Sequence, residues 1–190
     1  MCIRDSFWVL LTGVLAPGFI GTTIFYHQDY MATFNSWPPQ LFATSLVVLS
    51  VTTVVVALLT GAVVDRYGAI TVLPIFLLPL SASCLVLAAS GPPFLLFLAM
   101  GLLGISYGVS STLFGSLWPG IYGTAYLGSI RAVTVSAVVV ATAAGPGLTG
   151  TLIDRGVTLP RQLVDLGIYC LIATVAMGFA TVFLRRRAVG

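Results

Sequence analysis

The charged residues of this chain lie almost entirely between long apolar runs. The chain has 190 residues with eight basic and five acidic side chains, all of them arginine or aspartate. An arginine or aspartate at the centre of a bilayer costs about 2.5–3.5 kcal/mol on insertion scales, so membrane proteins place charges at the ends of their spans. The distribution therefore predicts an integral membrane protein embedded in a lipid bilayer.

Six apolar runs are long enough to cross that bilayer. About 20 consecutive apolar residues span the hydrocarbon core as a helix. The runs are apolar on every face, whereas the strands of a membrane β-barrel alternate apolar and polar residues. We therefore predict an all-α bundle over residues 7–187, followed by a tail at 188–190. Its six transmembrane helices are expected at Phe7–Gln28, Leu41–Val63, Ile70–Ala89, Phe94–Gly115, Ala132–Leu152 and Leu163–Leu184.

The positions of the arginines predict the orientation of the bundle. An even number of spans places both termini on one side, together with Arg66, Arg131 and Arg185–Arg187. The other side holds Arg155 and Arg161. By the positive-inside rule we expect both termini to be cytoplasmic. The net charge of +3 is thus a topology signal, and no nucleic-acid partner is expected.

The first six residues differ from the rest of the chain. Met1–Ser6 has neither the basic region nor the cleavage site of a signal peptide, and the first span follows at once. This stretch resembles read-through of a sequencing adapter. We expect residues 1–6 to be a non-native leader, and the chain to begin within a longer protein.

Small residues recur at three- and four-residue steps along two of the predicted helices. Such faces let helix backbones approach closely in a membrane, where no hydrophobic effect drives helix association. They are expected either to pack statically or to slide and line a cavity that opens and closes. The residues are Gly101, Gly104, Gly108, Ser111 and Gly115 in one stretch, and Gly128, Ala132, Ser136, Ala143, Gly147 and Gly150 in the other.

One short motif occurs twice. The first copy runs from Gly61 to Gly68 at the end of the second predicted helix, and the second runs from Gly150 to Gly156 at the end of the fifth. Three helices reverse the direction of the chain, so the copies fall on opposite faces of the membrane. This arrangement is typical of inverted-topology repeats in secondary transporters. We therefore predict a bundle built as two inverted three-helix repeats.

The same motifs resemble a known family. Gly61-x-x-x-Asp65-Arg66-x-Gly68 resembles the cytoplasmic loop signature of the major facilitator superfamily. Ala144-Gly145-Pro146-Gly147-x-x-Gly150 is similar to the eleventh helix of that superfamily, and 122–131 to the loop before it. The likeness spans Phe7 to Arg187 and is strongest with bacterial transporters of the monocarboxylate type. Members have twelve helices in two halves, and this chain resembles the second half.

The resemblance implies a location and a partner. It places the chain in the cytoplasmic membrane of a bacterium and implies a missing N-terminal six-helix half. It also implies that Asp65 and Arg66 latch the inward side, since a solvated pair of neighbouring charges contributes little by itself. Gly61 is expected to allow close helix approach, and Gly68 to adopt positive φ.

Two further features of the fifth predicted helix are gating candidates. Asp154 and Arg155 are expected to act outside as Asp65 and Arg66 act inside. Pro146, between Gly145 and Gly147, removes a helical hydrogen bond and kinks the helix. The kink is expected either to be passive or to be a hinge between inward-open and outward-open states.

Polar side chains on or near the spans are the candidates for a substrate path. His27 is the only histidine, and an unperturbed pKa of about 6.5 would let it exchange protons at physiological pH. It is expected to be either an interfacial polar residue or a contact for substrate or protons. Hydroxyls could bind a substrate or tie helices together, and an arginine could attract anions or snorkel to the interface. The candidates are Tyr26, His27, Gln28, Ser106, Tyr107 and Arg131.

No grouping of residues points to catalysis. The three cysteines are scattered, and no metal-ligand spacing or phosphate-binding glycine loop is present. We therefore expect no enzyme activity, metal or cofactor. The expected function is secondary transport of a small solute, for example a monocarboxylate, by alternating access, with an ion or proton gradient or exchange as its energy source. The alternative is a membrane assembly or structural subunit that transports nothing.

Overall fold

The computed structural model describes residues 3–38 and 40–188, with side chains for 7–38 and 40–182. The side chains of the expected leader, of Arg185–Arg187 and of the tail at 188–190 therefore lie outside the described part. The described residues form helices and turns without a strand. In chain order the helices are α1 Ile3–Tyr26, α2 Gln28–Phe34, α3 Gln40–Tyr67, α4 Ala69–Val72, α5 Leu78–Ala88, α6 Phe94–Tyr122, α7 Leu127–Asp154 and α8 Leu159–Ala188.

Five of these helices are long and apolar enough to cross a membrane. The candidate spans among the described residues are Phe7–Tyr26, Gln40–Tyr67, Phe94–Tyr122, Leu127–Asp154 and Leu159–Val182. Each corresponds to one of the six predicted spans. The prediction of an all-helical chain is confirmed, and the long apolar helices indicate an integral membrane protein.

The remaining predicted span, Ile70–Ala89, is wrong as a single helix. It consists of α4, a turn over residues 73–77, and the 11-residue α5. Pro74 and Pro79 explain the break, because proline lacks an N–H and clashes with the preceding turn of a helix. Pro79 is tolerated at the start of α5, where an N–H would have no helical partner anyway.

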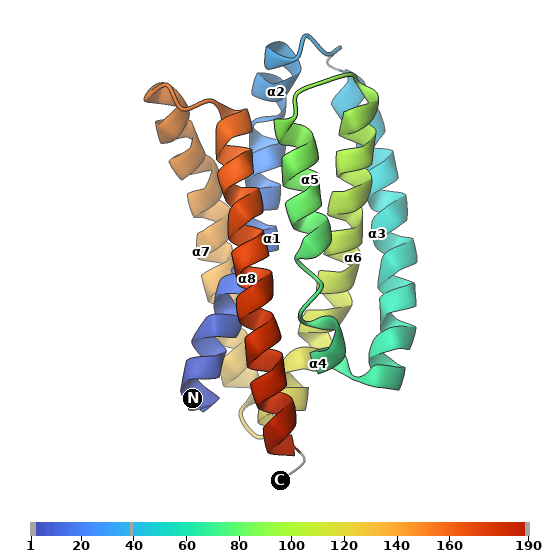
Figure 1. Cartoon of the computed structure of the whole chain (residues 1–190), viewed down its shortest axis with the longest axis vertical. Helices are drawn as coiled ribbons and strands as arrows, with labels where there is room; N and C mark the ends of the chain where they lie inside the picture. The colour runs from blue at the N-terminus through green and yellow to red at the C-terminus, as the bar shows by residue number, and fades with distance from the viewer. Residues whose placement is uncertain (1–2, 39, 189–190) are drawn as a thin grey trace.

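The helices form two layers (Figure 1). α5 and α8 stand side by side in front, and behind them α7, α1, α6 and α3 follow one another from left to right. The most extensive contacts join α3 to α6, α1 to α7, and α5 to both α8 and α6. α1 begins and α8 ends at the same end of the bundle.

Burial differs sharply between inner and flanking helices. Within the described residues, 56% of the span window in α1 is buried, against 11% in α3 and 6% in α7. The exposed side chains of the flanking helices are largely apolar, such as Leu58 in α3 and Val140 in α7. The core includes Leu73, Phe76 and Leu77 from the turn between α4 and α5, so protein rather than lipid covers much of that irregular backbone.

Candidate functional site

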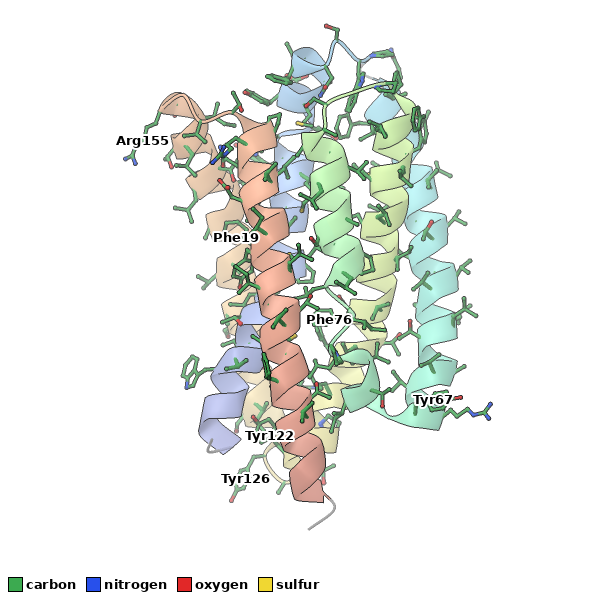
Figure 2. All side chains as sticks on the ribbon, in the orientation of Figure 1. Phe19, Tyr67, Phe76, Tyr122, Tyr126 and Arg155 are labelled. Carbon is green, nitrogen blue, oxygen red and sulfur yellow. The ribbon has the colours of Figure 1, made fainter. Side chains whose placement is uncertain are left out.

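The two motif copies lie at opposite ends of the bundle. The first ends α3 and the second ends α7, and Figure 2 shows Tyr67 and Arg155 at the two extremes. Asp65, Arg66 and Asp154 are likewise exposed. Within the described residues the salt bridge present is a different one, between exposed Arg161 and Asp165, with 3.7 Å between Nε and Oδ1. Both motif pairs are thus accessible to groups outside this chain.

The glycines of the first motif behave differently from one another. Gly68 has a φ of 81° between α3 and α4, which confirms the predicted positive φ. The close helix approach predicted at Gly61 is absent among the described residues, because a Cβ placed there would meet no atom within 4 Å. At the matching Gly150, the nearest atom to such a Cβ is His27 Nε2 at 3.9 Å.

The small-residue face of α6 packs directly on α3. A Cβ at Gly104 would come within 2.7 Å of the Leu49 carbonyl oxygen, and one at Gly108 within 2.7 Å of the Thr53 carbonyl oxygen. Only glycine allows backbones to lie this close. Thr112 extends the contact, since its hydroxyl donates a hydrogen bond of 3.1 Å to the Ala57 carbonyl. Static packing on this face is confirmed for Gly104 and Gly108.

The predicted small-residue face of α7 makes no comparable contact. Ala132, Ser136, Ala143 and Gly147 are exposed within the described structure, and a Cβ at Gly147 would meet no atom within 4 Å. α7 instead approaches α1 through Gly145, where a Cβ would lie 2.6 Å from the Phe19 carbonyl oxygen. Residues 145 and 147 are about 200° apart around a helix, so they face opposite directions.

Pro146 leaves one carbonyl of α7 without its helical donor. In a regular helix the N–H at position 146 would bond the carbonyl of Thr142. In this structure the Thr22 hydroxyl, on α1, donates to that carbonyl over 3.0 Å. Sequence reasoning missed Thr22. The available signal was a mid-span proline, whose freed carbonyl calls for a hydroxyl donor on a neighbouring helix.

Arg131 plays a similar part near the other end of the bundle. Pro119 lies inside α6 and cannot donate to the Gly115 carbonyl. Arg131 Nη2, on α7, donates to that oxygen over 3.2 Å. The exposed Arg131 side chain thus ties α7 to α6, which is a contact that neither of its two expected roles included.

His27 lies between the end of α1 and α7. The residue is only 9% exposed, and Nδ1 lies 3.0 Å from the Thr23 carbonyl oxygen. Because a carbonyl only accepts, Nδ1 carries the proton in this arrangement, and Nε2 faces Gly150. The flanking Tyr26 and Gln28 are exposed. His27 therefore lies where α1, α2 and α7 meet.

Ser106 and Tyr107 do not form a common groove with His27. Ser106 is fully buried, and its hydroxyl has no hydrogen-bond partner in the described structure. The Tyr107 hydroxyl instead lies against Gly21 of α1, and the Tyr107 ring lies 6.4 Å from that of Phe25. Consecutive helical residues point about 100° apart, which explains why Ser106 and Tyr107 face different surroundings.

Other residues line the pockets. An apolar pocket of about 290 Å³ lies among α1, α7 and α8, and a second pocket of about 290 Å³ lies between α2 and α3. Of the predicted substrate-path residues, only Gln28 lines one of them. The first is lined by Leu15, Ala16, Phe19, Ile20, Ala141, Leu166 and Tyr169, and the second by Gln28, Asp29, Ala32, Phe42, Ala43 and Leu46.

Two further observations bear on function. Among the described residues, no group of three or more histidine, cysteine or carboxylate side chains is placed to hold a metal ion. No family model, curated protein sequence or solved structure matches the chain.

Proposed function

We propose that this chain is one half of a secondary transporter of the major facilitator type, and that it moves a small solute by alternating access. In this proposal α4 and α5 together count as the third of six passes, beside α1, α3, α6, α7 and α8. A second six-helix half completes the transport path. A small organic anion such as a monocarboxylate is the proposed solute class, driven by an ion or proton gradient or by exchange.

The pattern of helix pairing is the observation that supports this proposal most. The first pass packs on the fifth, the second on the fourth, and the third on the sixth. Exchanging passes one to three with four to six turns the first of these pairs into the second, the second into the first, and leaves the third pair unchanged. Two inverted three-helix repeats would produce this pattern, which recurs in secondary transporters.

The motif copies fit the same exchange. They end α3 and α7, the second and fifth passes, at opposite ends of the bundle. These two helices are also the least buried of the candidate spans among the described residues. Their exposed faces support a second half that covers part of them, and the small residues Ala132, Ser136 and Ala143 would permit close approach on α7.

Two charged pairs and one proline act in the proposed cycle. Asp65 and Arg66 hold the inward side shut against the second half, and Asp154 and Arg155 act likewise outside. Pro146 lets α7 bend. Arg66 lies in the last turn of α3 and Arg131 near the start of α7. These helix ends lie at the end of the bundle where α1 begins and α8 ends, so the positive-inside rule would make that end cytoplasmic.

A membrane assembly subunit is the second candidate. The full burial of Ser106 and the separation of Ser106, Tyr107 and His27 support it, because these candidates share no open groove. Under this alternative the exposed faces of α3 and α7 bind partner helices permanently. A transport assay separates the two functions.

The test begins with the complete open reading frame that contains residues 7–187. Its product is reconstituted in lipid vesicles, and uptake is measured for a panel of small organic acids with and without a proton gradient. Asp65→Asn is expected to lower uptake by about tenfold or more, equivalent to about 1.4 kcal/mol. Membrane insertion should not change, because Asp65 lies at the end of α3 rather than within its apolar part.

Asp165→Asn is the matched control. It removes an exposed carboxylate that pairs with Arg161 and lies outside both motif copies, so uptake should stay at the native level. Unchanged uptake in Asp65→Asn removes this residue from the gate. Folded protein that moves no solute on the panel contradicts the transport function and favours the assembly subunit.

A further inference from the structure

The contact between Thr22 and Thr142 joins α1 to α7 at the site of the proline. The Thr22 hydroxyl donates to the Thr142 carbonyl over 3.0 Å, and Pro146 is the reason that this carbonyl needs a donor from outside its helix. We propose that Thr22 is a positioning residue that holds α7 closed on α1, and that loss of this hydrogen bond lets α7 bend at Pro146. The functional meaning of the bend rests on the proposed transport cycle.

The surrounding contacts place the pivot at one turn of α1. Gly145 brings the α7 backbone against Phe19 and Thr23, where a Cβ would lie 2.6 Å from the Phe19 carbonyl oxygen and 2.8 Å from Thr23 Oγ1. Beyond Pro146, a Cβ at Gly147 would meet no atom within 4 Å. Within the described structure, Phe19–Thr23 therefore contacts α7 just before the proline. Gly147, just beyond the proline, faces away from α1, and the following turn is joined to α8 by a hydrogen bond of 3.4 Å from Gln162 Nε2 to the Thr149 carbonyl.

The hydrogen bond is suited to reversible opening. The Thr22 hydroxyl also lies 2.8 Å from the Gly18 carbonyl oxygen, so its proton keeps an acceptor when α7 moves away. The hydroxyl of Thr142 is bonded to the Val139 carbonyl at 2.7 Å and does not compete. Of the groups in the Thr22–Thr142 contact, only the Thr142 carbonyl loses a donor on opening, and water that enters the opened space can replace it. The open state is therefore only modestly unfavourable.

Spin-label distances test the proposal in the whole chain, reconstituted in lipid nanodiscs after replacement of the native cysteines. The outer pair of labels, on cysteines at positions 148 and 47, reports the distance from α3 to the part of α7 beyond the proline. The inner pair, on cysteines at positions 133 and 58, reports the distance from α3 to the part of α7 before the proline. All four native side chains are large, apolar and exposed, so labels there disturb the packing little.

Thr22→Val keeps the side-chain shape and removes the hydroxyl. It is expected to raise the ratio of long to short distances for the outer pair by about threefold, as the average strength of an interhelical hydrogen bond in a membrane implies. The inner pair should not change. Thr22→Ser should restore the native distribution, because it keeps the donor.

Two variants separate this role from ordinary packing. Pro146→Ala supplies the missing N–H, so Thr22→Val should have no effect in that background. Thr112→Val removes a hydroxyl from the α3–α6 contact, where the Ala57 carbonyl keeps its helical donor, and the outer pair should not respond. An equal shift with Pro146→Ala present, or an equal shift from Thr112→Val, overturns the proposal.

The remaining outcomes are also decisive. If Thr22→Val does not fold, Pro146→Ala alone must lower the long-distance fraction, and an unchanged fraction overturns the proposal. The distances are measured without solute, so a response in a protein that moves no solute supports the hinge and contradicts the proposed transport. Normal uptake with unresponsive distances contradicts the hinge alone.

Discussion

The α1–α7 and α3–α6 contacts are built from similar parts. In each, a glycine brings two backbones together: Gly145 against the Phe19 carbonyl, and Gly104 against the Leu49 carbonyl. In each, a threonine hydroxyl reaches a carbonyl of the neighbouring helix, at 3.0 Å and 3.1 Å. The difference is that α7 contains Pro146, whereas α3 contains no proline.

Because of this difference, the interhelical hydrogen bond is an additional bond in one contact and the replacement for a missing helical bond in the other. In α3 the Ala57 carbonyl already accepts from its own helix, so Thr112 adds a second donor to a satisfied group. In α7 the Thr142 carbonyl depends on Thr22, because Pro146 offers no N–H. We infer that α7 depends on the hydroxyl of its neighbour at this contact, and that α3 does not.

The largest effect is expected from filling the α3–α6 contact. Gly104→Ala with Gly108→Ala places two methyl groups within 2.7 Å of backbone carbonyl oxygens that cannot rotate away. Overpacking of this kind costs about 1–3 kcal/mol at each site. The free energy of unfolding, measured by denaturant titration in mixed micelles, should fall accordingly. The control, Gly115→Ala with Gly120→Ala, meets no atom within 4 Å at either site and should leave stability unchanged or slightly higher.

A smaller effect is expected from filling the α1–α7 contact. Gly145→Ala puts a methyl group 2.6 Å from the Phe19 carbonyl oxygen, which costs about 1–3 kcal/mol if α7 cannot move. If α7 bends at Pro146 as proposed, part of this strain should be relieved by opening. The same titration is expected to show a loss below that of the α6 double variant, and Gly147→Ala should show none. A loss at Gly145 as large as that of the double variant would contradict the hinge.

The smallest effect is expected from removing the Thr112 hydroxyl, which joins α6 to α3. Thr112→Val removes one interhelical hydrogen bond and leaves the Ala57 carbonyl satisfied, so unfolding should become easier by about 0.6 kcal/mol or less. Thr112→Ser should recover the difference. A loss above about 1.7 kcal/mol, the upper end measured for such bonds in a membrane protein, would show that this contact is as dependent on its threonine as the α7 contact is.

The spans were predictable because the bilayer imposes one requirement on the whole chain. Five runs of apolar residues between charges became five long helices, since lipid leaves a backbone few alternatives. The break between α4 and α5 was missed although Pro74 and Pro79 are plain in the sequence. Hydropathy counts the apolar character of a proline and ignores its missing N–H.

The site was less predictable, because its residues depend on which helix faces which. The positive φ of Gly68 follows from a tight connection between two helices, and was predicted correctly. The contact at Gly145 in place of Gly147 does not follow from any local pattern. A helix that is apolar on all sides carries no stripe to mark its buried face. Thr22 becomes visible only once α1 is known to lie beside Pro146.

The broken segment 69–88 has a consequence for how the protein enters its membrane. The 11 residues of α5 extend only about 16 Å, roughly half the thickness of the hydrocarbon core. Its polar anchors come from helices synthesised later, since Ser83 donates to the Ala99 carbonyl of α6 and Ser81 to the Gly167 carbonyl of α8. The middle of the bundle can therefore reach its final form only after α8 has left the ribosome.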